Sequence, residues 1–507
     1  PDVHAMVSSN TSTSVPFTII WKPIMKQKIR GSLVFHGLLM FTCSILGNSP
    51  LFSEDWPQFR GPNCSGVSSS KLPLPVEFSH EKNVRWSVKL GDGISSPVVA
   101  NGRLFITAMA ESNRFSMYCF DAASGQLIWE QSFDTGPLPT ITPPNSAASS
   151  TPVTDGEHVF TYFSTLGLIG MDWDGRVLWK HKLPIPQYLL DWGAAASPIV
   201  YKDLVIFNQD DDLNPFLLGL DKFTGKVRWK TEREDMLAGY AVPVLCTANG
   251  RTDVVIAGSG KLKGYNPETG EEQWTCNTLL RTIMTTPVVH NDTIYITVQS
   301  YGDTNRVLKY ALLQWKDTNQ DGKLDPSEVP DSFGTKFKRG DINQDGFLVD
   351  DEIDAAFQSP DNMVGGGNVV QAVRGGGSGD VTDTHLLWQR PAKTRAPSNL
   401  SSPLVVHERL FVVKRGGISS CFNANTGEQH WYLKRIRNLG EYYASPVAGD
   451  GKIYVTGENG FVMVLADEPN LRILAKNDMG DTCIATPAIA DGRLFFRTKT
   501  ALLCISE

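Results

Sequence analysis

Short apolar runs bounded by turn residues recur along most of the chain. A Ser, Thr or Val followed by proline introduces such a run at eight places, Pro97, Pro152, Pro198, Pro243, Pro287, Pro403, Pro446 and Pro487. The intervals between them are 55, 46, 45, 44, 116, 43 and 41 residues. Apolar runs of strand length between turn signals are typical of β-structure, and a regular period indicates a repeat. The single long interval predicts an insertion.

Each repeat predicts four strands, as at 97–100, 103–107, 117–121 and 126–129. The fourth strand follows an Asp or Asn, a short spacer and a glycine, and it carries a tryptophan. These positions are Asp121/Gly125/Trp129, Asp172/Gly175/Trp179, Asp221/Gly225/Trp229, Asn266/Gly270/Trp274 and Asn423/Gly427/Trp431. Glycine suits a positive φ in the turn. The indole is large enough to pack between neighbouring sheets while its N–H is hydrogen-bonded.

Four short antiparallel strands per repeat predict the blade of a β-propeller. The last unit, 486–505, contains three strands, whereas 83–90 near the start is a strand with Trp86 and no partners of its own. We therefore predict an all-β, eight-bladed propeller closed by this N-terminal strand, which leaves no exposed sheet edge. The alternative of two β-sandwiches would not explain the regular period.

The long interval and the N-terminus set the predicted domain boundaries. The interrupted repeat has strands at 286–289, 294–298, 368–374 and 385–388, a turn at 375–379, and an α-helical insertion at 303–366. The propeller then comprises 54–302 and 367–507. Residues 1–24 are interpreted as a non-native or disordered leader. Residues 25–53 combine a basic start with a short apolar run, which predicts a signal peptide and a periplasmic or secreted protein. An uncleaved anchor is the alternative and would be the one route to a membrane.

Two segments of the insertion match the twelve-residue EF-hand loop, in which short oxygen-bearing side chains at alternate positions, a glycine at position 6 and a glutamate at position 12 surround Ca²⁺. The predicted ligands of the first loop are Asp317, Asn319, Asp321, Lys323 (through its carbonyl), Asp325 and Glu328. Those of the second are Asp341, Asn343, Asp345, Phe347 (through its carbonyl) and Glu352. The alternative is a polar surface turn that binds nothing, but two tandem matches favour calcium.

The two loops differ at position 9. Asp325 can hold a bridging water in the first loop, whereas Val349 offers no anchor in the second, so we predict that the second site is weaker. Leu324 and Leu348 at position 8 suit the short contact between paired loops. Residues Val307, Leu308, Ala311, Leu312 and Trp315 before the first loop, and Ile353, Ala356 and Phe357 after the second, predict apolar helix faces.

Charge is concentrated in the same segment. Residues 317–354 hold eleven acidic and four basic side chains, a net −7 that equals the formal charge of the whole 507-residue chain. Nucleic-acid binding requires a basic footprint, so we exclude it. The chain has eight cysteines, seven of them after the signal, without a CxxC pair, so at least one stays unpaired within a monomer.

One other acidic run, Asp210-Asp211-Asp212, admits two interpretations. It could be a metal or catalytic cluster, but we expect a solvated loop between two strands. No general base, oxyanion donor or nucleophile can be assigned from the sequence.

These repeats resemble the PQQ-like, or quinoprotein-type, β-propeller family over roughly residues 55–507. The specific element is Asp/Asn-x-x-x-Gly-x-x-x-Trp, as in 121–129, and Asp55-Trp-Pro-Gln-Phe-Arg-Gly-Pro62 looks like the start of exported members similar to the outer-membrane assembly propeller BamB. The resemblance implies one of two functions. Some members bind pyrroloquinoline quinone (PQQ) with Ca²⁺ and oxidise alcohols or sugars, whereas others are protein-binding scaffolds without a cofactor.

The chain departs from the enzymes of that family. They carry a disulfide between adjacent cysteines beside the quinone, and this chain has no adjacent cysteines. The family's tryptophans dock blades and do not bind the quinone. We therefore predict an exported, calcium-binding, non-catalytic scaffold for a protein or cell-envelope ligand, with no bound PQQ. The alternative is a PQQ- and Ca²⁺-dependent alcohol or sugar dehydrogenase.

Overall fold

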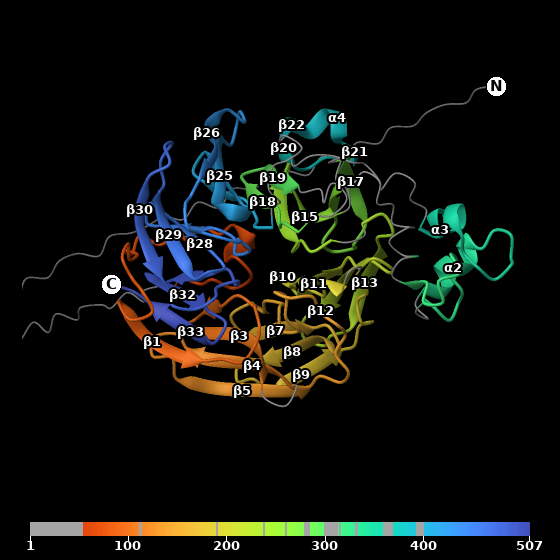
Figure 1. The fold of residues 1–507 in the computed structure, drawn as a ribbon, viewed down its shortest axis with the longest axis horizontal. Coiled ribbons are helices and arrows are strands. Elements are labelled where there is room, and N and C mark those ends of the chain that lie inside the picture. The colour runs from red at the N-terminus through yellow and green to blue at the C-terminus, as the bar shows by residue number, and fades with distance from the viewer. Residues whose placement is uncertain are drawn as a thin grey trace, which may run out of the picture. The chain divides into compact units, whose positions relative to one another are not determined.

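Eight antiparallel sheets are arranged in a ring (Figure 1). The computed structural model describes residues 54–507 apart from 111–113, 189–190, 237–238, 259–260, 278–283, 299–312, 314–315, 330–332, 358–368 and 392–399. The predicted leader and signal peptide lie outside the described residues. So do both ends of the insertion, and its predicted boundaries therefore stay a prediction.

The first four blades follow one another in chain order. Blade 1 comprises β2 (Val98–Ala100), β3 (Arg103–Ala110), β4 (Arg114–Asp121) and β5 (Leu127–Asp134), and blade 2 comprises β6 (Val153–Thr154), β7 (His158–Phe163), β8 (Gly167–Asp172) and β9 (Val177–His181). Blade 3 contains β10 (Ile199–Tyr201), β11 (Leu204–Gln209), β12 (Phe216–Asp221) and β13 (Val227–Glu232), and blade 4 contains β14 (Val244–Ala248), β15 (Arg251–Gly258), β16 (Lys261–Tyr265) and β17 (Glu272–Asn277).

The remaining blades include the interrupted one and the closing one. Blade 5 is β18 (Val288–His290), β19 (Thr293–Val298), β20 (Val369–Arg374) and β22 (Leu386–Pro391); blade 6 is β23 (Leu404–Val406), β24 (Arg409–Lys414), β25 (Ile418–Asn423) and β26 (Gln429–Arg435). Blade 7 is β27 (Val447–Gly449), β28 (Lys452–Thr456), β29 (Phe461–Ala466) and β30 (Ile473–Asp478). Blade 8 is β31 (Ala488–Ala490), β32 (Arg493–Arg497), β33 (Ala501–Ile505) and the N-terminal β1 (Val84–Lys89).

The N-terminal strand closes the ring as predicted. β1 pairs antiparallel with β33, with Lys89 opposite Ala501 and Val88 opposite Leu502. The closing blade thus joins the two ends of the chain and covers what would otherwise be a free sheet edge. The predicted eight-bladed propeller is confirmed.

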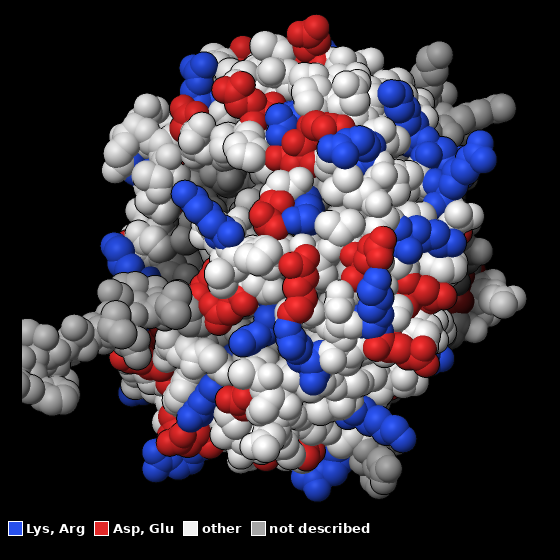
Figure 2. Space-filling model, turned by 90° about the vertical axis from the view of Figure 1, so that its left-hand side faces the viewer, with Lys and Arg blue, Asp and Glu red and all other residues white. Residues whose placement is uncertain are grey.

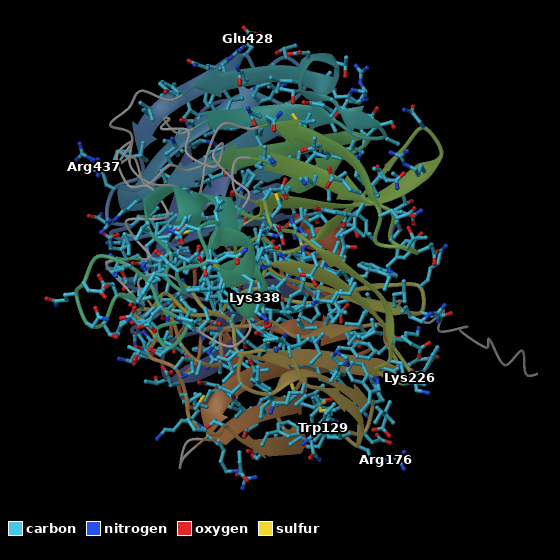
Figure 3. The ribbon with its side chains drawn as sticks, turned by 90° about the vertical axis from the view of Figure 1, so that its right-hand side faces the viewer. Trp129, Arg176, Lys226, Lys338, Glu428 and Arg437 are labelled. Carbon is cyan, nitrogen blue, oxygen red and sulfur yellow. The ribbon has the colours of Figure 1, made fainter. Side chains whose placement is uncertain are left out.

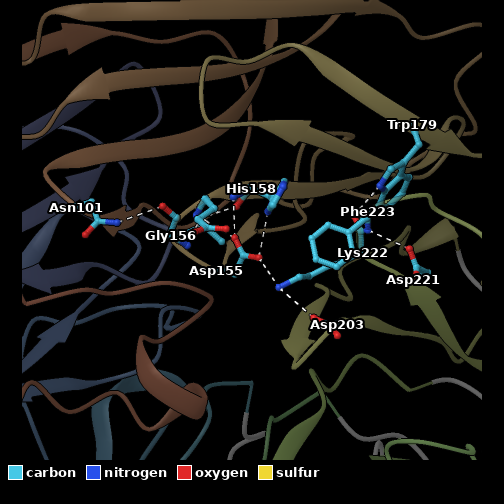
Figure 4. Close-up of polar contacts among 11 residues, drawn as sticks. Asn101, Asp155, Gly156, His158, Trp179, Asp203, Asp221, Lys222 and Phe223 are labelled. Atoms are coloured by element: carbon cyan, nitrogen blue, oxygen red, sulfur yellow. Dashed lines mark hydrogen bonds and ion pairs between the residues drawn. The ribbon is translucent and has the colours of Figure 1, made fainter.

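Repeated tryptophans dock five of the eight blades onto the next one, as predicted. Trp179 of β9 donates its indole N–H to the carbonyl of Lys222 at 2.8 Å, and a Cβ on Gly225 would lie 2.6 Å from the Trp179 ring. The Lys222 ammonium then binds Asp155 of blade 2 at 3.0 Å (Figure 4). The same docking joins Trp86, Trp129, Trp229 and Trp388 to the turns at Ala122, Trp173, Pro267 and Ala424. Trp274 and Trp431 differ, because their N–H groups bond within their own blades, to Asp253 and Ser419.

The predicted turn at 375–379 is wrong in part. Residues Gly379–Asp380 form β21, which pairs in parallel with β17, so Gly379 lies opposite Trp274. The chain leaving β20 therefore adds a fifth strand to the neighbouring blade before the short helix α4 (Thr382–His385) returns it to β22. This contact lies between segments about a hundred residues apart, so the local glycine run gives no sign of it.

The insertion connects β19 and β20 and contains two short helices, α2 (Gly334–Gly340) and α3 (Asp350–Phe357). They face the viewer in Figure 3, where Lys338 marks α2. Its apolar side chains form a small core of their own, made of Leu324, Phe333, Phe337, Leu348, Ile353 and Ala356. One propeller residue, Leu213 of the β11–β12 loop, completes this core.

The segment before β1 spans the axis of the ring. Trp56 pairs with Val99 of blade 1, Asn63 exchanges hydrogen bonds with Leu245 of blade 4, and Arg60 donates to the Pro403 carbonyl next to blade 6 at 2.7 Å. Further along, Val67 bridges to Ala448 of blade 7. Residues 56–67 therefore cross from one side of the ring to the other, and this is the structural role of the Asp55–Pro62 motif.

Candidate functional site

The first calcium-loop candidate has its carboxylates turned toward its own backbone. Asp317 accepts hydrogen bonds from the N–H groups of Asp321 and Gly322 at 3.1 and 2.8 Å. Glu328, eleven residues on, accepts from Thr318 at 2.9 Å and from Asp325 at 3.1 Å. Gly322 has φ +82°, which explains the glycine at position 6. The predicted ligands at positions 1 and 12 therefore both bind backbone N–H groups of the same loop.

The second loop repeats this geometry. Asp341 accepts from Gly346 at 3.1 Å, and Glu352 accepts from Asn343 at 3.4 Å and from Val349 at 3.3 Å. Gly346 has φ +85°. One difference is that Oδ1 of Asp341 is buried and has no hydrogen-bond partner. A buried carboxylate oxygen without a partner is costly and calls for a cation or water.

The two loops are joined by a short antiparallel backbone contact. Leu324 and Leu348 exchange both backbone hydrogen bonds, at 3.0 and 2.8 Å. The Lys323 ammonium lies 3.9 Å from the centre of the Phe347 ring, so the two position-7 residues also touch through side chains, which the sequence did not predict. Asp325 Oδ1 accepts from the Ser327 N–H at 2.6 Å, and its role as the anchor of a bridging water stays a prediction.

The oxygen atoms that the two loops offer are of the kind that calcium binds. They are carboxylate, amide and carbonyl oxygens, the ligands that a hard divalent cation prefers. In the described part of the chain, no three His, Cys, Asp or Glu side chains form a preassembled metal cluster, since these carboxylates bind backbone N–H groups. Each carboxylate oxygen has more than one lone pair, so it can accept a backbone N–H and still bind a cation. The predicted apolar residues Val307, Leu308, Ala311, Leu312 and Trp315 lie outside the described residues.

A second candidate site is a cavity of about 360 Å³ on the propeller axis. Aromatic walls are contributed by Phe59, Trp192, Tyr240 and Tyr443. Phe59 belongs to the segment that crosses the axis, so that segment forms one wall. Among the 24 described lining residues, Arg415 is the one charged side chain and none is a carboxylate.

The residues that precede the eight repeat prolines also line this cavity. Seven are hydroxyl residues and the eighth is Val242. Six of the eight blade-to-blade steps carry a hydrogen bond from the backbone N–H of one such residue to the hydroxyl of the next, at 2.9–3.1 Å: Ser96 to Thr151, Thr151 to Ser197, Val242 to Thr286, Thr286 to Ser402, Ser402 to Ser445 and Ser445 to Thr486. We call these eight residues the axial ring.

The axial ring has a chemical consequence. Each hydroxyl that accepts a backbone N–H keeps its own proton, and none of these protons has an acceptor among the described residues. The cavity is therefore lined by hydrogen-bond donors. The Ser/Thr-Pro step marked the repeat in the sequence, but nothing in one repeat shows that these residues meet on the axis.

The expectation for Asp210, Asp211 and Asp212 is wrong. All three are buried, at most 2% exposed. Both oxygens of Asp210 accept from Arg233 Nη1, at 2.7 and 2.8 Å, and Oδ2 also accepts from the Asn208 side-chain amide at 2.7 Å. Burial raises the pKa of Asp210 to about 6, although Arg233 lowers it. The run is thus a buried structural network instead of a solvated loop.

The cysteines are not reactive groups in this fold. All seven described cysteines are free and buried. Burial raises the pKa of Cys64, Cys119 and Cys504 to about 12, so they remain thiols at neutral pH.

Comparison with known proteins agrees with the ring. The family described as outer membrane protein assembly factor BamB matches residues 78–189 and 187–327. The crystal structure of BamB from Moraxella catarrhalis superimposes with a TM-score of 0.52 at 15% identity, covering 83% of this chain and 96% of that one. The chain is a member of the PQQ-like β-propeller family. Quinohemoprotein alcohol dehydrogenase from Comamonas testosteroni shares the fold with a TM-score of 0.50 at 10% identity, covering 89% of this chain and 80% of that one.

Part of the chain is also similar in sequence to part of an enzyme. Quinoprotein alcohol dehydrogenase PedH from Pseudomonas putida is 31% identical over 112 residues, which are 20% of this chain and 18% of that protein. The match thus spans less than a fifth of the relative's length. Among the described residues, no helix is long and apolar enough to cross a bilayer. On the face shown in Figure 2, basic and acidic side chains are interspersed.

Proposed function

We propose that this PQQ-like propeller is an exported calcium-binding scaffold that binds a protein or cell-envelope ligand without chemical conversion. The observation that carries the calcium part is the paired-loop geometry: in each loop the position-1 carboxylate accepts from the glycine at position 6 and the position-12 glutamate accepts from position 9, and the loops are joined through Leu324 and Leu348. The partnerless Oδ1 of Asp341 supports it, because a cation would satisfy this buried oxygen. Bound Ca²⁺ would offset the carboxylate repulsion within the insertion.

Asp317, Asn319, Asp321 and Glu328 would hold the first ion with the carbonyl of Lys323. Asp341, Asn343, Asp345 and Glu352 would hold the second with the carbonyl of Phe347. Calorimetric titration of the purified protein with Ca²⁺ tests this assignment. Glu328→Gln and Glu352→Gln should each remove one binding event. Glu428→Gln, at the exposed rim of blade 6 (Figure 3), is the matched control and should titrate like the unmodified protein. Two unchanged titrations would refute the assignment.

Ligand binding is supported by the axial cavity. Ligand sites are typically concave, mostly apolar pockets with a few directed polar groups, and this cavity combines aromatic walls with the hydroxyl donors of the axial ring. A ligand rich in hydrogen-bond acceptors would satisfy those donors. Export is supported by the basic and apolar pattern of residues 25–53 in the sequence.

A PQQ- and Ca²⁺-dependent dehydrogenase is the second candidate, favoured by the local match to the alcohol dehydrogenase PedH. Against it stand the lack of adjacent cysteines and the lack of a carboxylate among the described cavity residues. Reconstitution with PQQ and Ca²⁺ decides between them. Dye-linked oxidation of alcohols or sugars above the apoprotein would overturn the scaffold proposal.

A further inference from the structure

The insertion leaves the ring from blade 5 but docks on blade 3. Leu213, in the loop between β11 and β12, is 1% exposed and packs in the core formed by the insertion. The Lys336 ammonium of α2 donates to the Leu213 carbonyl, and Arg339 of the same helix binds Glu234, just after β13, at 3.1 Å. The insertion is thus fastened by one apolar and two charged contacts to a blade that is not its own.

The loop that receives it is the buried Asp210–Asp212 run. Asp211 accepts the N–H groups of Leu213 and Asn214 through one oxygen, at 3.0 and 2.6 Å, and that of Gln187 through the other, at 3.2 Å. Asp212 donates its N–H to the Gln187 carbonyl at 2.9 Å. From the insertion side, the Lys316 ammonium reaches the Gln187 side chain at 3.5 Å. Gln187 is therefore clamped between the acidic run and the insertion.

From Gln187 the contacts run to the axial cavity. Tyr188 is buried and stacks on Tyr240, with ring centres 4.8 Å apart. Tyr240 lies 6.4 Å from the Trp192 ring, and both rings line the cavity. A second route reaches the same place, because Gly239, next to Tyr240, donates its N–H to the Asp210 carbonyl at 2.9 Å.

We propose that the docked insertion supports the cavity wall formed by Trp192 and Tyr240, so that cation occupancy of the second loop controls the position of this wall. The inference rests on the proposed calcium binding. It deepens that proposal by giving the ion a regulatory role.

Loop two is placed to exert this control. α2, which carries Lys336, Phe337 and Arg339, runs directly into Asp341, whose N–H bonds to the Phe337 carbonyl at 2.9 Å. α3, which contains Glu352, carries Ile353 and Ala356 into the core around Leu213. Both helices that touch the propeller thus flank the second loop, whereas the first loop contributes only Leu324 to that core.

The test uses the purified protein labelled with 5-fluorotryptophan, with ¹⁹F NMR recorded in Ca²⁺ and after chelation. Trp192→Phe assigns the cavity resonance and Trp431→Phe assigns a control tryptophan, buried in blade 6. We expect chelation to shift or broaden the Trp192 resonance and leave Trp431 unchanged. Glu352→Gln should reproduce the chelated spectrum in Ca²⁺, and Glu328→Gln should do so less.

Amide exchange gives an independent readout of the same linkage. On chelation the amides of Gln187, Leu213 and Asn214 should exchange about tenfold faster or more, since their acceptor loses its support. The amides of Ser402 and Ser445 in the axial ring serve as controls and should not change.

Leu213→Ala, or the milder Arg339→Gln, should keep calcium binding by calorimetry yet lose the response of Trp192. Absence of calcium binding in the unmodified protein would refute the proposed function. Calcium binding with an unresponsive Trp192 and unchanged amides would refute this inference alone.

Discussion

Replacing Gly340 by alanine should loosen the insertion, although Gly340 is not itself a predicted calcium ligand. A Cβ at Gly340 would lie 2.5 Å from the Glu352 carbonyl oxygen and 2.6 Å from Ala356 Cβ, both in α3. Neither atom is the end of a flexible side chain, so α2 and α3 would have to separate. Overpacking of this kind costs about 1–3 kcal/mol. Better helix propensity returns at most about 1 kcal/mol.

Gly334 in the same helix is the matched control. No atom lies within 4 Å of a Cβ built there. Gly334→Ala therefore has the propensity gain without the clash and should be neutral or stabilising by up to about 1 kcal/mol. The two substitutions are chemically identical, and the structure predicts effects of opposite sign.

Hydrogen exchange of the Leu324 and Leu348 amides measures the outcome, because these two groups hold the loops together. A net loss of one to two kcal/mol corresponds to exchange faster by a factor of about 5–30 in Gly340→Ala. Exchange in Gly334→Ala should be unchanged or slower. Calcium affinity should fall in the first variant only. Equal exchange rates in the two variants would show that the α2–α3 crossing is not packed as described.

Three further predictions concern the propeller. Gly225→Ala should lower the melting temperature more than Gly102→Ala does. A Cβ at residue 225 would lie 2.6 Å from the Trp179 ring, whereas Gly102 has a similar positive φ and no neighbour within 4 Å of such a Cβ. Equal melting temperatures would count against tryptophan docking. Burial raises the pKa of Asp210 from 3.8 to about 6, so the stability that this carboxyl contributes is fully present below pH 3.8 and lost as the pH rises past 6. Urea unfolding should show the difference in unfolding free energy between the unmodified protein and Asp210→Asn shrinking by about 2 kcal/mol between pH 4 and 7. The seven buried cysteines should resist a chromogenic disulfide reagent at neutral pH and react once urea unfolds the protein; rapid reaction of the native protein would contradict their burial.

The blades could be predicted from the sequence because each is built from local contacts. A turn glycine, a following tryptophan and a proline before the first strand recur in most repeats, and within the blades neighbouring strands mostly pair in chain order. Closure by residues 84–89 was predictable as well, since a three-stranded last repeat requires a fourth strand. The backbone geometry of the loops at 317–328 and 341–352 belongs to the same class, because twelve consecutive residues define each one, and their calcium binding stays a prediction.

Burial of Asp210–Asp212 could not be predicted in this way. The groups that bury and bind it, Arg233, Gln187 and Lys336, come from three separate segments, and one of them belongs to the insertion. A hydrophilic run between two strands looks solvated unless its covering element is known. Docking of the insertion on blade 3 fails for the same reason, since Leu213 is one apolar residue in a polar loop.

The axial cavity shows how a symmetric fold acquires a directional site. Each blade contributes the residue before its proline, so eight equivalent positions would give eight equivalent hydroxyls and no preferred ligand orientation. Val242 breaks that equivalence on blade 4, Arg415 adds charge from blade 6, and Phe59 adds an aromatic surface from the axial segment. Donors therefore surround the axis with one apolar gap, and an acceptor-rich ligand with an apolar edge would bind in one orientation. Val242→Thr should close the gap by supplying a hydroxyl for the Ser197 N–H. It should lower the affinity for any ligand that the gap orients, and it should leave the fold intact.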